Sequence, residues 1–236
     1  MAADDILDQI LDECRRADRP VVVFDLDSTL FSTAARNLRI LTEFAAETGV
    51  PPAMAADIAR LGVDDMGWNV VQDLQKRGHA DADSLARLRA YWFERFFTNE
   101  YCQLDDPMPG AVRYCHDCCD VGATVYYLTG RDEPGMGDGT RASLRKHGFP
   151  FDVPHATLRL KPRFEMADLE FKREVVAELP AFGEIVGCFE NEPVNANLFA
   201  AAFPAAHMVF LETVHSPDPP PLHPRIVRRR DFLRAK

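Results

Sequence analysis

Two aspartates directly follow one of the most apolar stretches of the chain. Residues 21–24 contain no polar side chain, which predicts a strand buried on both faces, and they lead into Asp25 and Asp27. Carboxylates at the end of a buried strand are costly unless a cation or a reaction uses them. In open α/β sheets the ligand site lies at the carboxyl ends of the strands. The segment predicts a catalytic or metal site, and the plainer alternative is an acidic, solvated strand end.

Two further predicted strands end in polar residues. The apolar stretches 123–128 and 184–189 both run directly into such residues. Parallel strands place their carboxyl ends on one edge of the sheet, so we expect the three ends to converge in one crevice. Acid oxygens hold hard cations, and hydroxyl and cationic groups hold phosphate oxygens. The polar residues at the three strand ends are Asp25, Asp27, Thr129, Arg131, Glu190, Asn191 and Glu192.

Three basic residues are candidates for binding an anionic substrate in this crevice. Lys172 opens a predicted helix, and the field of a helix N-terminus favours phosphate, so Lys172 is preferred as the catalytic lysine. Lys161, which precedes a proline, is favoured as a solvated lysine or a substrate contact over a catalytic role. Arg131 is a candidate for binding an anionic substrate group, and an internal salt bridge is the equal alternative.

These motifs resemble those of the haloacid dehalogenase-like superfamily of phosphohydrolases. The resemblance rests on D-L-D-S-T at 25–29, L-T-G-R at 128–131, a lysine of the third motif and E-N-E at 190–192. It implies an α/β fold with a doubly wound, mostly parallel Rossmann-like sheet and an inserted α-helical cap. The activity that it implies is that of a phosphatase, a phosphoric monoester hydrolase that forms a phosphoaspartyl intermediate.

The resemblance also implies a role for each motif residue. Asp25 would be the nucleophile, and Asp27 would be the general acid and then the general base. Thr129 would bind the transferring phosphoryl group, and Lys172 would neutralise charge on the nucleophile and the phosphate. Magnesium would lie between the carboxylate of Asp25, the backbone carbonyl of Asp27 and the acids at 190–192.

The fourth motif departs from the family pattern because it contains glutamates where aspartates are usual. The extra methylene moves the carboxylate by more than about one ångström on general bond lengths. Glu190 is therefore expected to bind magnesium either directly or through water, and Asn191 or Glu192 could share the task.

The chain between the first two motifs is far longer than one strand crossover needs. We therefore expect residues 31–105 to form a helical cap of the C1 type, inserted into a catalytic core made of residues 1–30 and 106–236. The resemblance implies that such a cap roofs the active site, selects the substrate and excludes water when it closes.

Predicted cap helices cover 36–49, 53–61, 66–77 and 81–99. The aromatic residues of the last helix are expected to form the core of a small helical domain, in preference to a substrate-stacking platform. These aromatic residues are Tyr91, Trp92, Phe93, Phe96 and Phe97. The candidate pocket residues, each equally a candidate for a plain surface or core position, are Arg36, Arg39, Trp68 and Asn69.

Strands alternate with helices in the remainder of the chain, which predicts a mostly parallel sheet. The segment D-E-P-G-M-G-D-G at 132–139 is expected to be a glycine-rich loop, and the proline-rich, basic tail is expected to run across the domain surface. Helices are predicted at 3–17, 111–120, 140–147, 170–179 and 195–202, and further strands at 157–160 and 207–212.

The composition limits the possible partners and compartment. The net charge of −10 and the pI near 5.2 argue against a nucleic-acid-binding surface. No apolar run approaches the roughly 20 residues that span a bilayer, and the acidic start does not resemble a signal peptide, so a cytoplasmic location is expected. The cysteines of C-H-D-C-C at 115–119 have no second ligand pair and are expected to be structural.

The sequence therefore predicts a magnesium-dependent phosphomonoesterase that acts on a small phosphorylated metabolite, because a cap of this size would hinder large substrates. One alternative is a phosphotransferase or mutase of the same superfamily, and another is an inactive member that binds a ligand or partner. The phosphorylated end of a nucleic acid is a further substrate class, which the overall acidity disfavours. The oligomeric state stays open.

Overall fold

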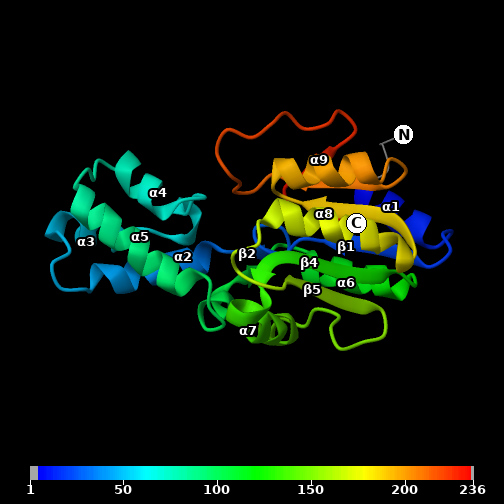
Figure 1. The fold of residues 1–236 in the computed structure, drawn as a ribbon, viewed down its shortest axis with the longest axis horizontal. Coiled ribbons are helices and arrows are strands. Elements are labelled where there is room, and N and C mark those ends of the chain that lie inside the picture. The colour runs from blue at the N-terminus through cyan, green and yellow to red at the C-terminus, as the bar shows by residue number, and fades with distance from the viewer. Residues whose placement is uncertain (1–4, 235–236) are drawn as a thin grey trace.

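The computed structural model describes residues 5–234 and has a central sheet covered by helices on both faces (Figure 1). The six strands lie in the order β5-β4-β1-β6-β7-β8, and each neighbouring pair is parallel. The predicted α/β class with a doubly wound, mostly parallel sheet is confirmed. The strands are β1 (Pro20–Phe24), β4 (Thr124–Asp132), β5 (Ala156–Lys161), β6 (Glu184–Glu190), β7 (His207–Leu211) and β8 (Val227–Arg229).

Strand β1 is the centre of the fold because its alternate side chains enter two different cores. Val22 and Phe24 pack in the core on one face of the sheet, and Val21 and Val23 pack in the core on the other. All five residues of the strand are buried, as the uninterrupted apolar run predicts. The first core is covered by α1 (Ile6–Cys14), α6 (Ala111–Asp120) and α7 (Glu133–Lys146), and the second by α8 (Asp168–Glu178) and α9 (Pro193–Ala202).

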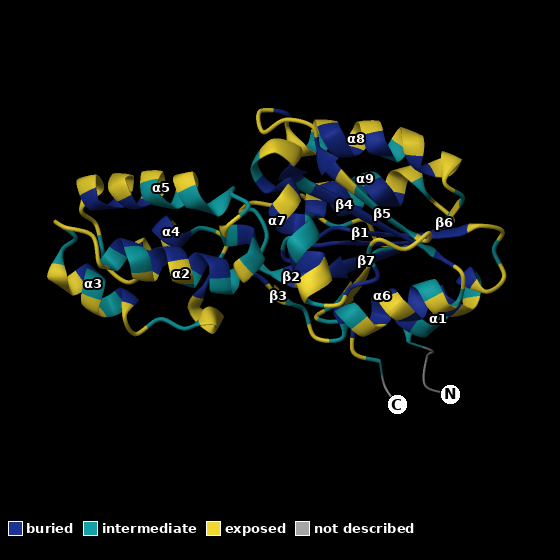
Figure 2. Ribbon diagram, turned by 90° about the horizontal axis from the view of Figure 1, so that it is seen from below, coloured by how far each residue is buried: buried dark blue, intermediate teal, exposed yellow. Residues whose placement is uncertain are grey.

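A separate group of helices lies beyond one end of the sheet (Figure 2). It is joined to the sheet by two short strands, β2 (Phe31–Ser32) and β3 (Asp106–Pro107), which pair with each other in antiparallel orientation. Its own apolar core is formed by Leu41, Phe44, Met54, Ile58, Met66, Val70, Val71, Leu74, Leu85 and Leu88. The group contains α2 (Ala34–Ala45), α3 (Pro52–Ile58), α4 (Val70–Lys76), α5 (Ala82–Phe96) and the 3-10 turns η1 (Val63–Asp65) and η2 (Tyr101–Leu104).

Several predicted helices extend beyond the observed bounds, and two segments show clear differences from the sequence-based expectation. The glycine-rich segment 132–139 is not a loop, because α7 begins at Glu133. A Cβ atom at Gly139 would overlap the carbonyl oxygen of Asn99, so the glycine permits a close approach of this helix to the end of the helical group. The predicted helix 66–77 is shorter, since α4 begins only at Val70.

The tail was expected to run across the surface, and it also adds a strand. Residues 227–229 form β8, which pairs in parallel with β7 at the sheet edge. Before this strand, Arg225 donates hydrogen bonds to the carbonyl oxygens of Phe203 and Ala206, beyond the end of α9. A cation at that position interacts favourably with the helix dipole and the unpaired carbonyls there.

The cysteines Cys115 and Cys118 of the C-H-D-C-C segment lie in the apolar core on one face of the sheet. Cys115 and Cys118 are buried, burial raises the pKa of both thiols well above the usual value, and all six cysteines are free. Within residues 5–234, no helix combines the length and the hydropathy that a membrane span requires.

Candidate active site

The carboxyl ends of β1, β4 and β6 lie at one edge of the sheet and line a single cavity of about 420 Å³. The structure brings together the strand-end residues that the sequence singled out, and it adds the preferred lysine to them. Lys161 is not part of the lining. The predicted residues that line the cavity are Asp25, Asp27, Thr129, Arg131, Lys172, Glu190, Asn191 and Glu192, together with the pocket candidates Trp68 and Asn69.

Lys172 joins the ends of two strands at the floor of this cavity. Its Nζ lies 2.8 Å from Asp25 Oδ1 and 2.6 Å from Glu190 Oε2, and all three side chains are buried. The sequence analysis expected Lys172 to open its helix. The structure differs, because α8 begins at Asp168 and places Lys172 in the second turn. Contact with both carboxylates, rather than the field of the helix N-terminus, places Lys172 in the site.

The pKa of Asp25 is raised to about 8. Burial is the largest cause, the charge of Glu190 adds to it, and Lys172 opposes both. Two buried carboxyl groups thus share one ammonium group, so ionisation of both would leave an excess of negative charge at the floor of the cavity. A bound cation would compensate that charge.

The three residues at 190–192 have different neighbours. Glu190 Oε1 accepts hydrogen bonds of 3.0 Å from the backbone N–H groups of Asn191 and Glu192, which fixes the carboxylate against Lys172. The Glu192 carboxylate instead accepts hydrogen bonds from the backbone N–H and the hydroxyl of Ser216, at 2.9 and 2.7 Å. Asn191 Oδ1 accepts from the Thr29 hydroxyl at 3.0 Å. Of the two glutamates, Glu190 alone is bonded to Lys172.

Asp27 is held by two arginines. Arg131 Nε donates to Asp27 Oδ1 at 2.9 Å, and Arg36 Nη2 donates to the same oxygen at 3.1 Å. Burial alone would raise the pKa of Asp27, but the two guanidinium groups outweigh it and lower the pKa to about 2. The neighbouring acids Asp25 and Asp27 therefore have opposite electrostatic environments.

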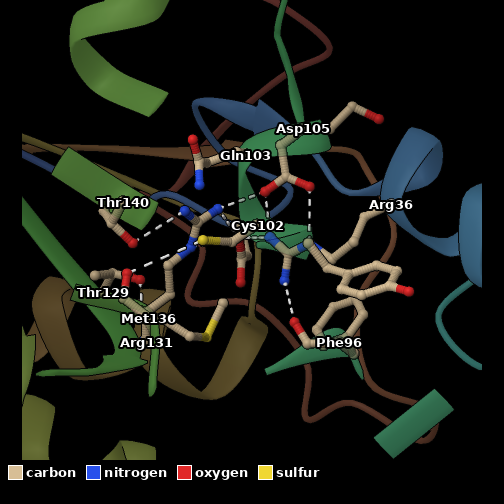
Figure 3. A network of polar contacts seen from close by, with 12 residues as sticks. Arg36, Phe96, Cys102, Gln103, Asp105, Thr129, Arg131, Met136 and Thr140 are labelled. Atoms are coloured by element: carbon tan, nitrogen blue, oxygen red, sulfur yellow. Dashed lines mark hydrogen bonds and ion pairs between the residues drawn. The ribbon is translucent and has the colours of Figure 1, made fainter. Parts of the chain in front are cut away.

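Asp105 is a member of this site that the sequence analysis missed (Figure 3). Its buried carboxylate accepts hydrogen bonds from Arg36 Nε at 2.8 Å and from Arg131 Nη2 at 2.6 Å. We call Arg36, Arg131, Asp27 and Asp105 the buried ion-pair cluster. Because Arg36 follows β2 and Asp105 precedes β3, the cluster ties both connections of the helical group to Asp27. No motif marks Asp105, and its partners are distant in the sequence.

Arg131 and Lys161 are the two residues for which substrate binding was considered. The side chain of Arg131 is fully buried and also donates to the Thr140 hydroxyl at 3.2 Å, so it forms the internal salt bridges that were the alternative. Lys161 pairs with Asp168 at 2.7 Å. Thr129 Oγ1 accepts from the backbone N–H of Arg131 at 3.2 Å, which leaves its hydroxyl hydrogen available to a ligand.

The donor set fits a partly hydrated magnesium ion. Lys172 occupies Oδ1 of Asp25, so Oδ2 is left for a cation. In residues 5–234, no group of three or more His, Cys, Asp and Glu side chains forms a metal cage. Magnesium does not need one, because it keeps several waters and is held by one or two carboxylates together with substrate phosphate. The negative charge that Asp25 and Glu190 carry together when both are ionised favours such an ion.

The helical group contributes aromatic residues to the same cavity. Tyr91 packs against Phe44 in the helical core, with ring centroids 5.5 Å apart, as expected. Trp92 also packs against this core and lines the cavity as well. The expectation is wrong for Phe93, Phe96 and Phe97, which line the cavity. The pocket candidate Arg39 instead pairs with Glu43 on the surface. The cavity-lining aromatic residues are Trp68, Trp92, Phe93, Phe96 and Phe97.

No family model and no curated protein sequence matches the chain. Several solved structures are similar to it. A hydrolase of the haloacid dehalogenase-like family from Streptococcus pneumoniae has a TM-score of 0.54 and 12% identity, over 88% of this chain and 92% of that one.

Two further structures are similar over comparable lengths. A Clostridium difficile protein described as a candidate phosphatase has a TM-score of 0.57 and 10% identity, over 89% of this chain and 93% of that one. The Mycobacterium tuberculosis Protein Tyrosine Kinase A has a TM-score of 0.56 and 15% identity, over 90% and 93%. The parallel sheet and these similarities together show that the chain has the haloacid dehalogenase-like fold.

Proposed function

We propose that this protein is a magnesium-dependent phosphomonoesterase that forms a phosphoaspartyl intermediate on Asp25. The observation that supports this most strongly is the arrangement of Asp25, Lys172 and Glu190 at the floor of the cavity. A buried carboxylate that shares one lysine with a second carboxylate suits a nucleophile whose charge is compensated only when cation and phosphate are bound.

In the proposed reaction, the carboxylate of Asp25 attacks phosphorus, and Lys172 stabilises the charge on the nucleophile and on the phosphoryl oxygens. The Thr129 hydroxyl donates a hydrogen bond to the same phosphoryl group. Asp27 transfers a proton to the leaving oxygen and later accepts one from the attacking water. When bound by Asp25 and the backbone carbonyl of Asp27, magnesium would neutralise charge that spreads over the phosphoryl oxygens.

The proton for the leaving oxygen has a defined source in this proposal. Because its pKa is about 2, Asp27 is ionised in the free protein. The proton therefore does not start on Asp27, and a phosphomonoester monoanion carries one below its second pKa of about 6. Asp27 would accept this proton and pass it on to the leaving oxygen.

The helical group is proposed to act as a cap, with residues 31–105 inserted into a core of residues 1–30 and 106–236. Its aromatic side chains and the catalytic carboxylates line one cavity of about 420 Å³. A cavity of this size encloses a small molecule rather than a folded partner. The substrate is therefore proposed to be a small phosphorylated metabolite, enclosed away from bulk water during transfer.

The test is release of phosphate from p-nitrophenyl phosphate and benzyl phosphate, with and without magnesium. We expect magnesium-dependent turnover that Asp25→Asn reduces by about 10⁴-fold or more, as is usual for loss of a nucleophile. Asp18→Asn is the matched control, because Asp18 is exposed before β1 at the opposite end of that strand. Turnover that persists in folded Asp25→Asn protein, or that needs no metal, would contradict the proposal.

A further inference from the structure

The cap side of the cavity has apolar surface that residues 5–234 leave exposed. Trp68 and Phe93 both line the cavity, and they are 47% and 51% exposed. Exposed aromatic side chains beside a set of catalytic charges are typical of a ligand-binding surface. Because both residues share one cavity with Asp25, a ligand whose phosphate lies at Asp25 would place its remaining atoms against these rings.

We call the aromatic residues that line the cavity, Trp68, Trp92, Phe93, Phe96 and Phe97, the cap wall. Contacts within the protein fix the orientation of most of its rings before a ligand binds. Trp92 Nε1 donates to Asn37 Oδ1 at 2.7 Å, and its ring stacks on Phe96 with centroids 4.4 Å apart. Phe93 and Phe97 make edge-to-face contacts with each other and with Phe164, which lies between β5 and α8. The centroid distances are between 5.1 and 5.6 Å. A wall held in this way loses little side-chain entropy when a ligand packs on it.

The two side-chain amide oxygens on the cap side are engaged within the protein. The side-chain oxygen of Asn37 accepts from Trp92, and that of Asn69 caps α4 by accepting from Val71 and Gln72. Among residues 5–234, Arg89 is the one charged side chain of the cap that lines the cavity. A polyhydroxylated leaving group would lose hydrogen bonds to water and recover few of them here. Aromatic faces and edges instead favour another aromatic ring.

We propose that the substrate is a phosphomonoester of an aromatic alcohol, with its planar ring packed against Trp68 and Phe93. This inference rests on the proposed phosphatase function and names its substrate class. In the reaction, a bond forms between Asp25 and phosphorus, and the bond between phosphorus and the alcohol oxygen breaks. The bonding electron pair leaves with that oxygen, which receives the proton held by Asp27, and an aromatic alcohol is released.

Binding can be measured without turnover, because both tryptophans of the chain, Trp68 and Trp92, line the cavity. The probes are benzylphosphonate and cyclohexylmethylphosphonate, which are not hydrolysed and differ in the aromaticity of one ring. We expect benzylphosphonate to change the tryptophan fluorescence. With magnesium present, it should bind at least about tenfold more tightly than cyclohexylmethylphosphonate. Equal affinities, or tighter binding of the cyclohexyl compound, would overturn the proposal.

Phe93→Leu tests whether the ring itself carries the preference, since leucine retains an apolar side chain. We expect the preference for benzylphosphonate to fall from about tenfold to about threefold or less. The matched control is Phe182→Leu. Phe182 is 36% exposed, packs against Tyr126 and lies outside the cavity lining. An unchanged preference in folded Phe93→Leu protein, or an equal loss in Phe182→Leu, would contradict the assignment.

Turnover separates this inference from the proposed function on which it rests. Benzyl phosphate and cyclohexylmethyl phosphate both release primary alkoxides, so their intrinsic reactivities are similar. A benzyl ester hydrolysed at least about tenfold more efficiently supports both proposals. Hydrolysis of both esters at equal efficiency retains the phosphatase and overturns the aromatic preference. Discrimination between the phosphonates without hydrolysis of any ester retains the aromatic site and overturns the phosphatase.

Discussion

The sheet edge, where β1, β4 and β6 end, and the cap wall line the same cavity. They are built from different kinds of contact. At the sheet edge, the charges of Asp25, Lys172 and Glu190 are buried and hydrogen-bonded to one another. On the cap wall, Trp68 and Phe93 leave about half of their side-chain surface exposed. In the proposed function, the edge carries out the reaction and the wall selects the substrate. The two functions should therefore be separable by mutation.

Among variants that keep the nucleophile, the largest effect is expected at the sheet edge from Lys172→Met. Loss of the ammonium group removes the cation that stabilises charge developing on phosphate, so kcat should fall by about 10² to 10³. The ratio of benzyl to cyclohexylmethyl ester turnover should stay unchanged, because the wall is intact. Steady-state kinetics with both esters measure this. A changed ratio with kcat retained would contradict the assignment of catalysis to the sheet edge and of substrate selection to the cap wall.

The two glutamates of the fourth motif should differ strongly. Glu190→Gln removes the carboxylate that bonds Lys172, and we expect about a 10²-fold loss of kcat/KM and a weaker dependence on magnesium. Glu192→Gln alters a side chain that bonds Ser216 of the tail, and we expect less than about a threefold change. Magnesium titrations of activity compare the two variants. Similar losses in both variants would mean that Glu192 takes part in the reaction to the same extent as Glu190.

Asp105→Asn should affect both stability and activity, because it leaves two buried arginines with one carboxylate. Breaking a buried ion pair typically lowers the free energy of unfolding by about 3–5 kcal/mol. We expect about a tenfold lower kcat as well, since Asp27 loses its fixed surroundings. Urea unfolding and kinetics measure the two effects. Asp106→Asn is the matched control, as Asp106 is the exposed neighbour, and an equal effect there would refute the role of the cluster.

The smallest effect is a pH dependence of stability that comes from Asp25. Its pKa is about 8 in the folded protein and about 4 when unfolded, so between these values the folded state holds a proton that the unfolded state releases. Stability contributed by this proton is lost as the pH rises through that window. Without magnesium, the Tm of Asp25→Asn should therefore exceed that of the wild type by a few degrees more at pH 8 than at pH 5.

Thermal unfolding of wild type and Asp25→Asn at both pH values measures this shift. Asp18→Asn, whose exposed carboxylate lies away from the cavity, should show no such difference. An equal Tm difference between Asp25→Asn and wild type at pH 5 and pH 8 would mean that the sheet edge does not hold Asp25 in the proposed environment.

The sheet edge was predictable because its signals are local. A buried run followed by Asp25 and Asp27 can be recognised within eleven residues, 21–31, and parallel topology then brings the other strand ends together. The orientations of Glu190 and Glu192 were not predictable, because they depend on Ser216 and Lys172, which are distant in the sequence. Long-range hydrogen bonds leave no pattern in the spacing of residues.

The cap wall was harder to predict because helical periodicity does not say what covers a face. The aromatic residues near the end of α5 cover more than one side of the helix, and the same pattern fits a core and a cavity wall. Asp105 was missed because its two arginine partners lie in other elements. Tertiary packing also overrode local signals at Gly139, where close approach to Asn99 makes glycine suitable within α7.

The most direct test of the account is the detection of phosphate covalently bound to Asp25. Asp27→Asn protein is mixed with p-nitrophenyl phosphate and magnesium, quenched in acid, and digested for peptide mass analysis. The p-nitrophenolate leaving group needs no proton, whereas hydrolysis of the intermediate needs the base at position 27, so the intermediate should accumulate. The account predicts one PO₃ group on the peptide that contains Asp25. Release of p-nitrophenol with no modified Asp25, or with the group on another residue, would contradict it.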